Sequence, residues 1–390
     1  MRIYADHAAT TPVRKEVLQA MLPFFTSVYG NPSSLHTEGQ EALIEIEKAR
    51  RKLAESIGAE KEEILFTSGG TESNNVVLRS MRSVEKGRHI IVSAIEHASV
   101  LEAAAALERE GFSISILPVD RYGKASPDDL RQLITSETVL VSCQLVNNET
   151  GSLMPVEEMG NICREAGVLF HVDAVQGLGK TKIDLSSLPV DLMSLSAHKI
   201  GGPKGTGAIY HRHGIRLFPA LYGGRQERGL RAGTENVPGI IGFGEASRLA
   251  VEEMEISNQK IRSLQNELVT GLIREVPGIH FNGPLVGAEH MPKVPHTQIP
   301  GYINTRFEGV EGETLVQFAD IQGLAISAGS ACHEGSDQPS HVLLALGLTV
   351  NEAKESIRIT LGQENTSSEV DEMIRVFRTI VPRLRQMRQS

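Results

Sequence analysis

The sequence predicts an α/β protein with a mostly parallel central sheet flanked by helices, and a smaller α+β region beside it. Short apolar runs alternate with amphipathic helical segments from about residue 60 to residue 200, which is typical of βαβ units. The chain has 390 residues and is 40% hydrophobic, enough for a sizeable core and for two domains. We expect a large domain at residues 15–245 and a small domain formed by residues 1–14 with 246–390.

Composition excludes several classes of partner and site. The net charge is −9, tryptophan is absent and no basic run occurs, so direct binding to nucleic acid or to a membrane surface is not expected. The sequence has no run of about 18 apolar residues and no apolar signal region, so we expect a cytoplasmic protein. Cys143, Cys163 and Cys332 form no Cys-x-x-Cys pair and predict neither a disulfide framework nor a metal site.

Each element has its own local signal. Gly58 ends a long amphipathic helix, and Ser126 with Pro127 caps and opens another. Pro277 and Gly278 end a helix whose apolar residues lie near one face. We expect helices at 15–25, 37–57, 97–109, 155–166 and 246–275, and two more that begin near Thr71 and Ser126. We expect strands at 90–93, 113–119, 139–143, 168–172 and 190–195, and another that begins at Ile64.

Polar side chains follow the ends of several of these strands. They are Thr71, His97, Asn148, Asp173 with Gln176, and the stretch from Ser196 to Lys199. Ligands of parallel α/β sheets bind at the carboxyl ends of the strands, so these residues predict a single site.

Lys199 lies just after an apolar strand and is followed by Gly201, Gly202 and Gly205. A lysine is costly to bury unless its amine is paired or covalently used. One interpretation is a Schiff base between Lys199 and pyridoxal phosphate (PLP). The other is a surface lysine at a strand end with glycines for the turn, and this stretch alone leaves both open.

Other residues fit a PLP site, each with a plainer alternative. The helix start at Gly70 and Thr71 suits a phosphate, or is an ordinary turn with Thr71 as its N-cap. Asp173 suits the pyridine nitrogen, or caps a turn. Gln176 and Asn148 could hydrogen-bond to the ring oxygen, or they are ordinary turn residues. His97 suits stacking on the ring, or is simply a packed or solvated histidine.

Eight stretches in this order and spacing carry a family resemblance. They are residues 4–12, 30–34, 67–73, 146–151, 171–176, 196–199, 226–236 and 327–332. Over essentially its whole length the chain resembles the PLP-dependent cysteine desulfurases of the NifS/IscS type, in the class V aminotransferase-like superfamily. The resemblance implies the PLP-dependent transferase fold of type I, with a large PLP-binding domain and a catalytic cysteine loop on the small domain.

The resemblance also implies roles for individual residues. Lys199 would form the Schiff base and shuttle protons, with His97 stacked on the ring, Asp173 at the ring nitrogen and Gln176 at the ring hydroxyl. The phosphate would be held by Gly70, Thr71, Ser196 and His198, and by Thr234 of a neighbouring subunit, which implies a homodimer. Asn148 would position cofactor or substrate, and Arg358 would bind the substrate carboxylate.

The implied reaction converts L-cysteine to L-alanine. The Cys332 thiolate would attack the substrate sulfur and become a persulfide, which then supplies a sulfur-acceptor protein such as an iron–sulfur scaffold or a tRNA thiolation enzyme. A small buried thiol is the plainer interpretation of a cysteine, and it suits Cys143 and Cys163 better than Cys332, whose neighbours are small and polar. The alternatives are a selenocysteine lyase, a related PLP aminotransferase, and a sulfur-relay scaffold with vestigial PLP binding.

Overall fold

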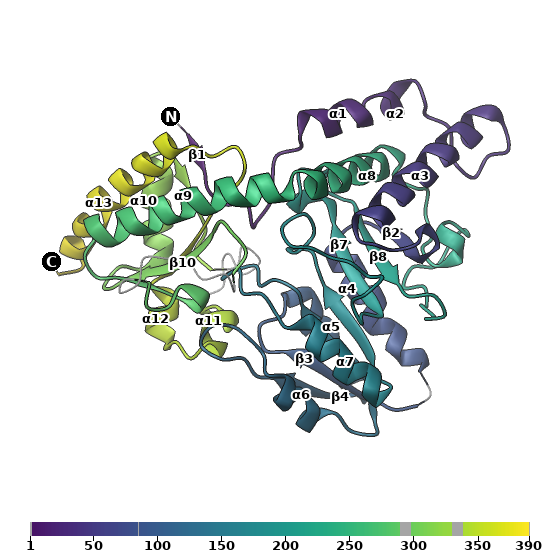
Figure 1. The fold of residues 1–390 in the computed structure, drawn as a ribbon, viewed down its shortest axis with the longest axis horizontal. Helices are drawn as coiled ribbons and strands as arrows, with labels where there is room; N and C mark the ends of the chain where they lie inside the picture. Colours follow the sequence, from purple (N-terminus) through teal and green to yellow (C-terminus); the bar gives the residue numbers. More distant parts are fainter. Residues whose placement is uncertain (1, 85, 289–297, 330–337, 390) are drawn as a thin grey trace.

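The computed structural model describes residues 2–84, 86–288, 298–329 and 338–389 (Figure 1). Its largest element is a seven-stranded sheet in the order β2-β8-β7-β6-β5-β3-β4. The strands are β2 (Ile64–Thr67), β3 (His89–Ser93), β4 (Ser113–Leu117), β5 (Thr138–Gln144), β6 (Leu169–Asp173), β7 (Leu192–Ser196) and β8 (Gly207–His211). All neighbours pair in parallel except β8, which runs antiparallel between β2 and β7. The predicted mostly parallel sheet is confirmed.

Helices cover both faces of this sheet because its strands are apolar on both sides. In β3, Ile90 and Val92 pack in the core under α4 and α5, whereas Ile91 packs in the core on the opposite face. The helices are α1 (Lys15–Met21), α2 (Pro23–Thr26), α3 (Thr37–Ser56), α4 (Gly70–Ser80), α5 (Ala98–Arg109), α6 (Pro127–Leu133), α7 (Val156–Ala166) and α8 (Val237–Glu252). None of the described helices combines the length and the apolar character that a membrane crossing requires.

Two helices, α8 and α9 (Met254–Glu275), replace the single helix expected at residues 246–275. That expectation is wrong in two respects, because the helical region begins earlier and is interrupted at Glu253. Asn236 caps α8 by accepting a hydrogen bond from the Gly239 amide. Glycines lower helix propensity, and several occur in α8, which hides its start in the sequence. The predicted domain boundary after residue 245 falls inside α8, and the division into two domains stays a prediction.

The smaller region has its own sheet and its own core. A three-stranded antiparallel sheet has the order β12-β10-β9, and β1 pairs in parallel with β11. The strands are β1 (Ile3–Tyr4), β9 (Ile279–Phe281), β10 (Tyr302–Phe307), β11 (Leu324–Ala325) and β12 (Ser356–Thr360). The remaining helices are α10 (Gly312–Ile321), α11 (His341–Ala345), α12 (Val350–Lys354) and α13 (Ser367–Gln389). The first strand and the last helix therefore share one core, although they are the two ends of the chain.

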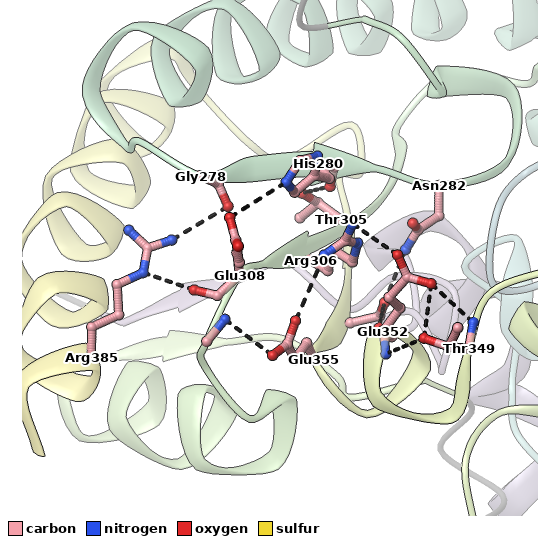
Figure 2. Close-up of polar contacts among 12 residues, drawn as sticks. Gly278, His280, Asn282, Thr305, Arg306, Glu308, Thr349, Glu352, Glu355 and Arg385 are labelled. Atoms are coloured by element: carbon pink, nitrogen blue, oxygen red, sulfur yellow. Dashed lines mark hydrogen bonds and ion pairs between the residues drawn. The ribbon is translucent and has the colours of Figure 1, made fainter. Parts of the chain in front are cut away.

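A polar network fixes α12 against this small sheet (Figure 2). Arg306 on β10 lies 2.9 Å from Glu352 and 3.7 Å from Glu355. Glu352 also completes a capping box with Thr349 at the start of α12. Because β12 follows α12 almost directly, the network helps set the β10–β12 register, in which Asn304 lies opposite Arg358.

The contact between α3 and α8 gives a stability prediction. A Cβ on Gly244 would lie 2.7 Å from Cα of Ala49, whereas a Cβ on Gly242 would first meet the flexible side chain of Met21. Alanine at either position gains about 1 kcal/mol of helix propensity. We expect Gly244→Ala to lose about 1–3 kcal/mol of stability through overpacking and to have a lower thermal midpoint than the wild type. Gly242→Ala should unfold at a higher temperature than Gly244→Ala. Equal midpoints for the two variants, measured by circular dichroism, would contradict this packing argument.

Candidate active site

A cavity of about 280 Å³ lies at the carboxyl ends of the parallel strands. Its lining includes most of the residues singled out in the sequence: Gly70, Thr71, His97, Asn148, Asp173, Gln176, Ser196, His198, Lys199 and Arg358. Thr234 is exposed in the segment before α8 and does not line this cavity. Cys332 lies outside the described residues. The single chain therefore brings together every predicted site residue except these two.

Lys199 is held by the N-terminal loop. It ends a short 3₁₀ turn (Ala197–Lys199) directly after β7, and its Nζ donates to the carbonyl oxygens of Ala8 and Ala9 at 2.6 Å each. The neighbouring His198 accepts hydrogen bonds on its carbonyl oxygen from the amide and the hydroxyl of Thr11. Burial lowers the pKa of His198 to about 4, with Lys199 as the next cause, so its imidazole is neutral near pH 7.

Asp173 is the last residue of β6 and is buried. Its Oδ2 accepts a 2.8 Å hydrogen bond from Nδ2 of Asn74, and its Oδ1 accepts one from the Val175 amide at 3.0 Å. Asn74 also donates to the Ser99 hydroxyl, which ties α4 to the start of α5. Each oxygen accepts one hydrogen bond and keeps a second lone pair, so the arrangement suits a further N–H donor. Sequence reasoning missed Asn74, and the only signal for it is its position one helical turn after Gly70.

His97 is the N-cap of α5. Its Nδ1 accepts from the Ser99 amide at 3.1 Å and lies 2.8 Å from the Ser99 hydroxyl. These contacts fix the ring at the rim of the cavity and place the proton of the neutral ring on Nε2. His97 is thus a helix cap and a cavity residue at once.

The start of α4 differs from the turn that the sequence allows. Gly69, not Thr71, is the N-cap, with φ of 153°, and no side chain caps the first amides. A Cβ on Gly70 would lie 2.7 Å from Val175, so a larger residue there would crowd the cavity wall. The positive end of α4 and its first amides are consequently available to an anion.

Arg358 lies in the middle of β12 and is buried, with 1% of its surface exposed. One terminal nitrogen donates to Oδ1 of Asp6 at 2.7 Å and the other to the Asn148 carbonyl oxygen at 3.1 Å. Among the described residues its buried Nε has no hydrogen-bond partner. A buried N–H without a partner is costly, and an acceptor such as a carboxylate would satisfy it.

Gln176 is surrounded by two residues that sequence reasoning missed. Its Nε2 donates to the Ala8 carbonyl oxygen at 2.9 Å. Its Oε1 accepts from Lys180 Nζ at 2.9 Å and from the Tyr302 hydroxyl at 2.5 Å. Lys180 lies four residues after Gln176 in the same turn, but nothing in the sequence indicates that Tyr302 of the small sheet lies here.

The segments on either side of residues 330–337 are attached to the site. Ser327 exchanges two backbone hydrogen bonds with Arg358, at 3.1 and 2.7 Å. On the other side, the Ser340 hydroxyl donates to Glu149 at 2.6 Å, and His341 lies 2.9 Å from the Glu96 carbonyl oxygen. Both flanks therefore end on elements that line or adjoin the cavity.

Cys143 and Cys163 are free and buried. Burial raises the pKa of the Cys143 thiol well above its usual range and that of Cys163 to about 12. Since the thiolate is the nucleophilic form, neither cysteine is suited to sulfur chemistry near pH 7.

Comparisons with known proteins agree over the whole chain. A family model described as aminotransferase class-V matches residues 3–373. The cysteine desulfurase IscS of Methanosarcina thermophila is 46% identical over 387 residues, which cover 99% of this chain and 93% of that relative. A solved structure described as a NifS-like protein has a TM-score of 0.90 at 38% identity, and the match covers 98% of this chain and 100% of that one. Another, described as SspA in complex with cysteine, has a TM-score of 0.80 at 35% identity, covering 94% and 100%.

The fold and the cavity define a PLP enzyme of fold type I, as the sequence predicts. More narrowly, the chain belongs to the class V aminotransferase family and, within it, to the cysteine desulfurases of the IscS and NifS type.

A buried histidine beneath the site gives a pH prediction. His171, two residues before Asp173 on β6, contacts the hydroxyls of Ser142 and Ser194, and burial lowers its pKa to about 4. In the unfolded chain His171 takes up its proton near the usual pKa of 6.5. The buried neutral ring therefore makes its full contribution to the free energy of unfolding above about pH 6.5. This contribution is lost as pH falls toward 4, at up to about 1.4 kcal/mol per pH unit.

We therefore expect His171→Gln to flatten the fall in denaturation midpoint between pH 7 and pH 5. The exposed His213 provides the control, since His213→Gln should leave the slope of the wild type. Identical slopes in all three proteins would show that His171 does not titrate as proposed.

Proposed function

We propose that this protein is a PLP-dependent cysteine desulfurase. It converts L-cysteine to L-alanine and transfers the sulfur to its own Cys332, which carries it as a persulfide to an acceptor protein. The observation that carries this proposal is one cavity that unites the amine of Lys199, the buried carboxylate of Asp173 and the incompletely paired guanidinium of Arg358. A related structure described as holding cysteine supports the choice of substrate.

The residues of the cavity fit PLP. The uncapped amides at Gly70 and Thr71, with Ser196 and His198 opposite, suit the phosphate. Asp173 suits the protonated ring nitrogen, because each of its oxygens accepts one N–H and keeps a lone pair for a further donor. Gln176 would meet the ring oxygen and His97 would stack on the ring. When bound, PLP supplies an electron sink for the carbanion that forms at the substrate α-carbon.

Lys199 is the proposed proton carrier. Its Nζ would take the α-proton of the substrate and return a proton later in the reaction. The carbonyl oxygens of Ala8 and Ala9 accept hydrogen bonds from this nitrogen, so they hold it beside the cavity whenever it is released from the cofactor.

Arg358 is the proposed anchor for the substrate carboxylate. Its guanidinium is oriented by Asp6 and by the Asn148 carbonyl oxygen, and no described residue accepts a hydrogen bond from its Nε. A carboxylate bound there, with Asn148 beside it, places the amino acid with its α-carbon toward Lys199.

Cys332 is the proposed nucleophile. Its thiolate would attack the substrate sulfur, so that the carbon–sulfur bond breaks and a sulfur–sulfur bond forms, leaving alanine and a Cys332 persulfide. The other two cysteines are unsuited to this step because burial raises the pKa of both thiols. Selenocysteine lyase and aminotransferase activities, and a scaffold with vestigial PLP binding, are less favoured by the similarity to cysteine desulfurases along the whole chain.

Partners and location extend the proposal. A homodimer would allow Thr234 to contribute to the phosphate site of the neighbouring subunit. The persulfide would serve iron–sulfur cluster assembly or another thiolation pathway, and the protein would act in the cytoplasm.

Replacing Cys332 separates cofactor chemistry from sulfur chemistry. Cys332→Ala should bind PLP and still give a spectral change with L-cysteine, since Lys199 and Asp173 are intact. Production of sulfide and alanine should fall by at least roughly 100-fold, because nothing attacks the substrate sulfur. As controls, Cys143→Ala and Cys163→Ala should keep their activity, with a stability loss of roughly 1 kcal/mol. In the wild-type protein treated with L-cysteine, mass spectrometry should find one added sulfur on Cys332. Finding it on Cys143 or Cys163 would refute the assignment.

Mixed dimers test whether Thr234 acts across subunits. Lys199→Ala should be inactive and Thr234→Ala impaired. In a hybrid of the two, the site of the Thr234→Ala subunit keeps Lys199 and receives Thr234 from its partner. Random mixing makes half the dimers hybrid, with one intact site each, so about a quarter of the wild-type sulfide production should return. Activity that stays at the average of the two parents would exclude the cross-subunit role.

A further inference from the structure

Lys180 lies behind the cavity, where the large and small sheets meet. Its Nζ contacts Oε1 of Gln176 at 2.9 Å and the hydroxyl of Tyr302 at 3.1 Å. The Tyr302 hydroxyl in turn donates to the same Oε1 at 2.5 Å. The backbone of Lys180 is fixed as well, because its carbonyl oxygen accepts from Asn258 of α9 at 2.9 Å. The three side chains therefore form a closed triangle of hydrogen bonds.

The chemistry of these neighbours fixes the orientation of the Gln176 amide. Lys180 carries N–H groups in its charged and its neutral form alike, and the amide oxygen is the atom that accepts from it. A carbonyl oxygen only accepts, so the atom that faces Ala8 at 2.9 Å is the nitrogen. The oxygen has two lone pairs, and Lys180 and Tyr302 occupy both. The amide has only one N–H of Nε2 left to offer to the cavity that Gln176 lines.

The protonation states of the triangle are consistent with these roles. Burial raises the pKa of Tyr302, so its hydroxyl keeps its proton and donates it to Gln176. Burial, followed by the charges of Lys199 and Arg358, lowers the pKa of Lys180 to about 7. An amine donates hydrogen bonds in its neutral form as well as in its charged form, so the contact to Gln176 persists on both sides of neutrality.

We propose that Lys180 and Tyr302 are positioning residues that hold Gln176 as a hydrogen-bond donor, so that the site selects the deprotonated form of the PLP ring oxygen. This inference rests on the proposed PLP-dependent function. With the amide reversed, its carbonyl oxygen would face the ring and would favour the protonated ring hydroxyl. The donor orientation acts in favour of the ring anion, and the charge of Lys180 adds to this effect while the amine is protonated.

A small cavity of about 100 Å³ adjoins this triangle and provides room for a longer side chain. Lys180, Lys199 and Tyr302 line it together with His7 and Glu364. The space makes Lys180→Arg a suitable conservative variant, since arginine also donates and cannot accept.

The experiment records absorption spectra of the PLP-loaded protein without substrate. At a pH at which the nitrogen of the PLP linkage is protonated, the form with a deprotonated ring oxygen absorbs in the visible, and the form with a protonated ring oxygen in the near ultraviolet. We expect the ratio of visible to near-ultraviolet absorbance to fall about ten-fold in Lys180→Met, because Gln176 then loses its fixed donor orientation and with it the hydrogen bond to the charged ring oxygen. Gln176→Glu should give the same shift, because a carboxylate cannot donate. Lys180→Arg should restore the ratio of the wild type.

Controls separate the possible failures. Lys182→Met makes the same change on an exposed lysine two residues away and should leave the spectrum unchanged. If Lys180→Met does not fold, Tyr302→Phe, which removes one donor from Oε1, and Gln176→Glu decide the outcome. A wild-type protein that forms no PLP linkage would overturn the proposed function itself. A wild type that forms the linkage, with unchanged spectra in Lys180→Met, Tyr302→Phe and Gln176→Glu, would overturn only the role of Lys180 and Tyr302.

Discussion

The carbonyl oxygen of Ala8 is the acceptor on which the geometry of the site depends. It receives hydrogen bonds from Lys199 at 2.6 Å and from Gln176 at 2.9 Å, so one backbone group orients both side chains. The same loop pairs with β12, where the Ala8 amide donates to the Thr360 hydroxyl, and with the end of β7, where Thr11 binds the carbonyl of His198. The N-terminal loop thus joins the strand that carries Arg358 to the strand that precedes Lys199.

Three basic side chains lie in or beside the cavity, whose lining also includes the carboxyl group of Asp173. Lys180, Lys199 and Arg358 are close enough for the latter two to lower the pKa of Lys180, and Asp6 pairs with only one side of the Arg358 guanidinium. Such an arrangement is unfavourable for the empty site, because like charges repel and the buried Nε of Arg358 has no partner in the described part of the chain. In the proposed function, an anionic cofactor and an amino-acid carboxylate would relieve both effects, so their binding would also neutralise charge.

Much of this could be predicted from the sequence, and the exceptions have physical reasons. The parallel sheet follows from alternating apolar and amphipathic segments, and the site from polar residues at strand ends. The strand β8 escaped prediction because glycines surround it. The helix α8 escaped because its glycines lower helix propensity, although Gly244 allows a close contact with Ala49 of α3. The contact between Lys180 and Tyr302 joins residues 122 positions apart, and periodicity carries no information on such pairs. Thr234 does not line the cavity of a single chain, so neither pattern nor fold places it there.

The N-terminal loop also affects how the chain folds during its synthesis on the ribosome. Ala8 and Thr360 are bonded partners separated by 352 positions, and the first strand pairs with β11 near the other end of the chain. Domains fold as they emerge, with the N-terminal part synthesised first, yet here the earliest segment must wait for almost the last. The central sheet has all its strands by residue 211, but the substrate pocket closes only after β12 has left the exit tunnel. During that interval the strand that carries Arg358 has not yet joined Lys199, which follows the carboxyl end of β7. The nascent chain therefore contains the residues that face the cofactor before its active site is complete.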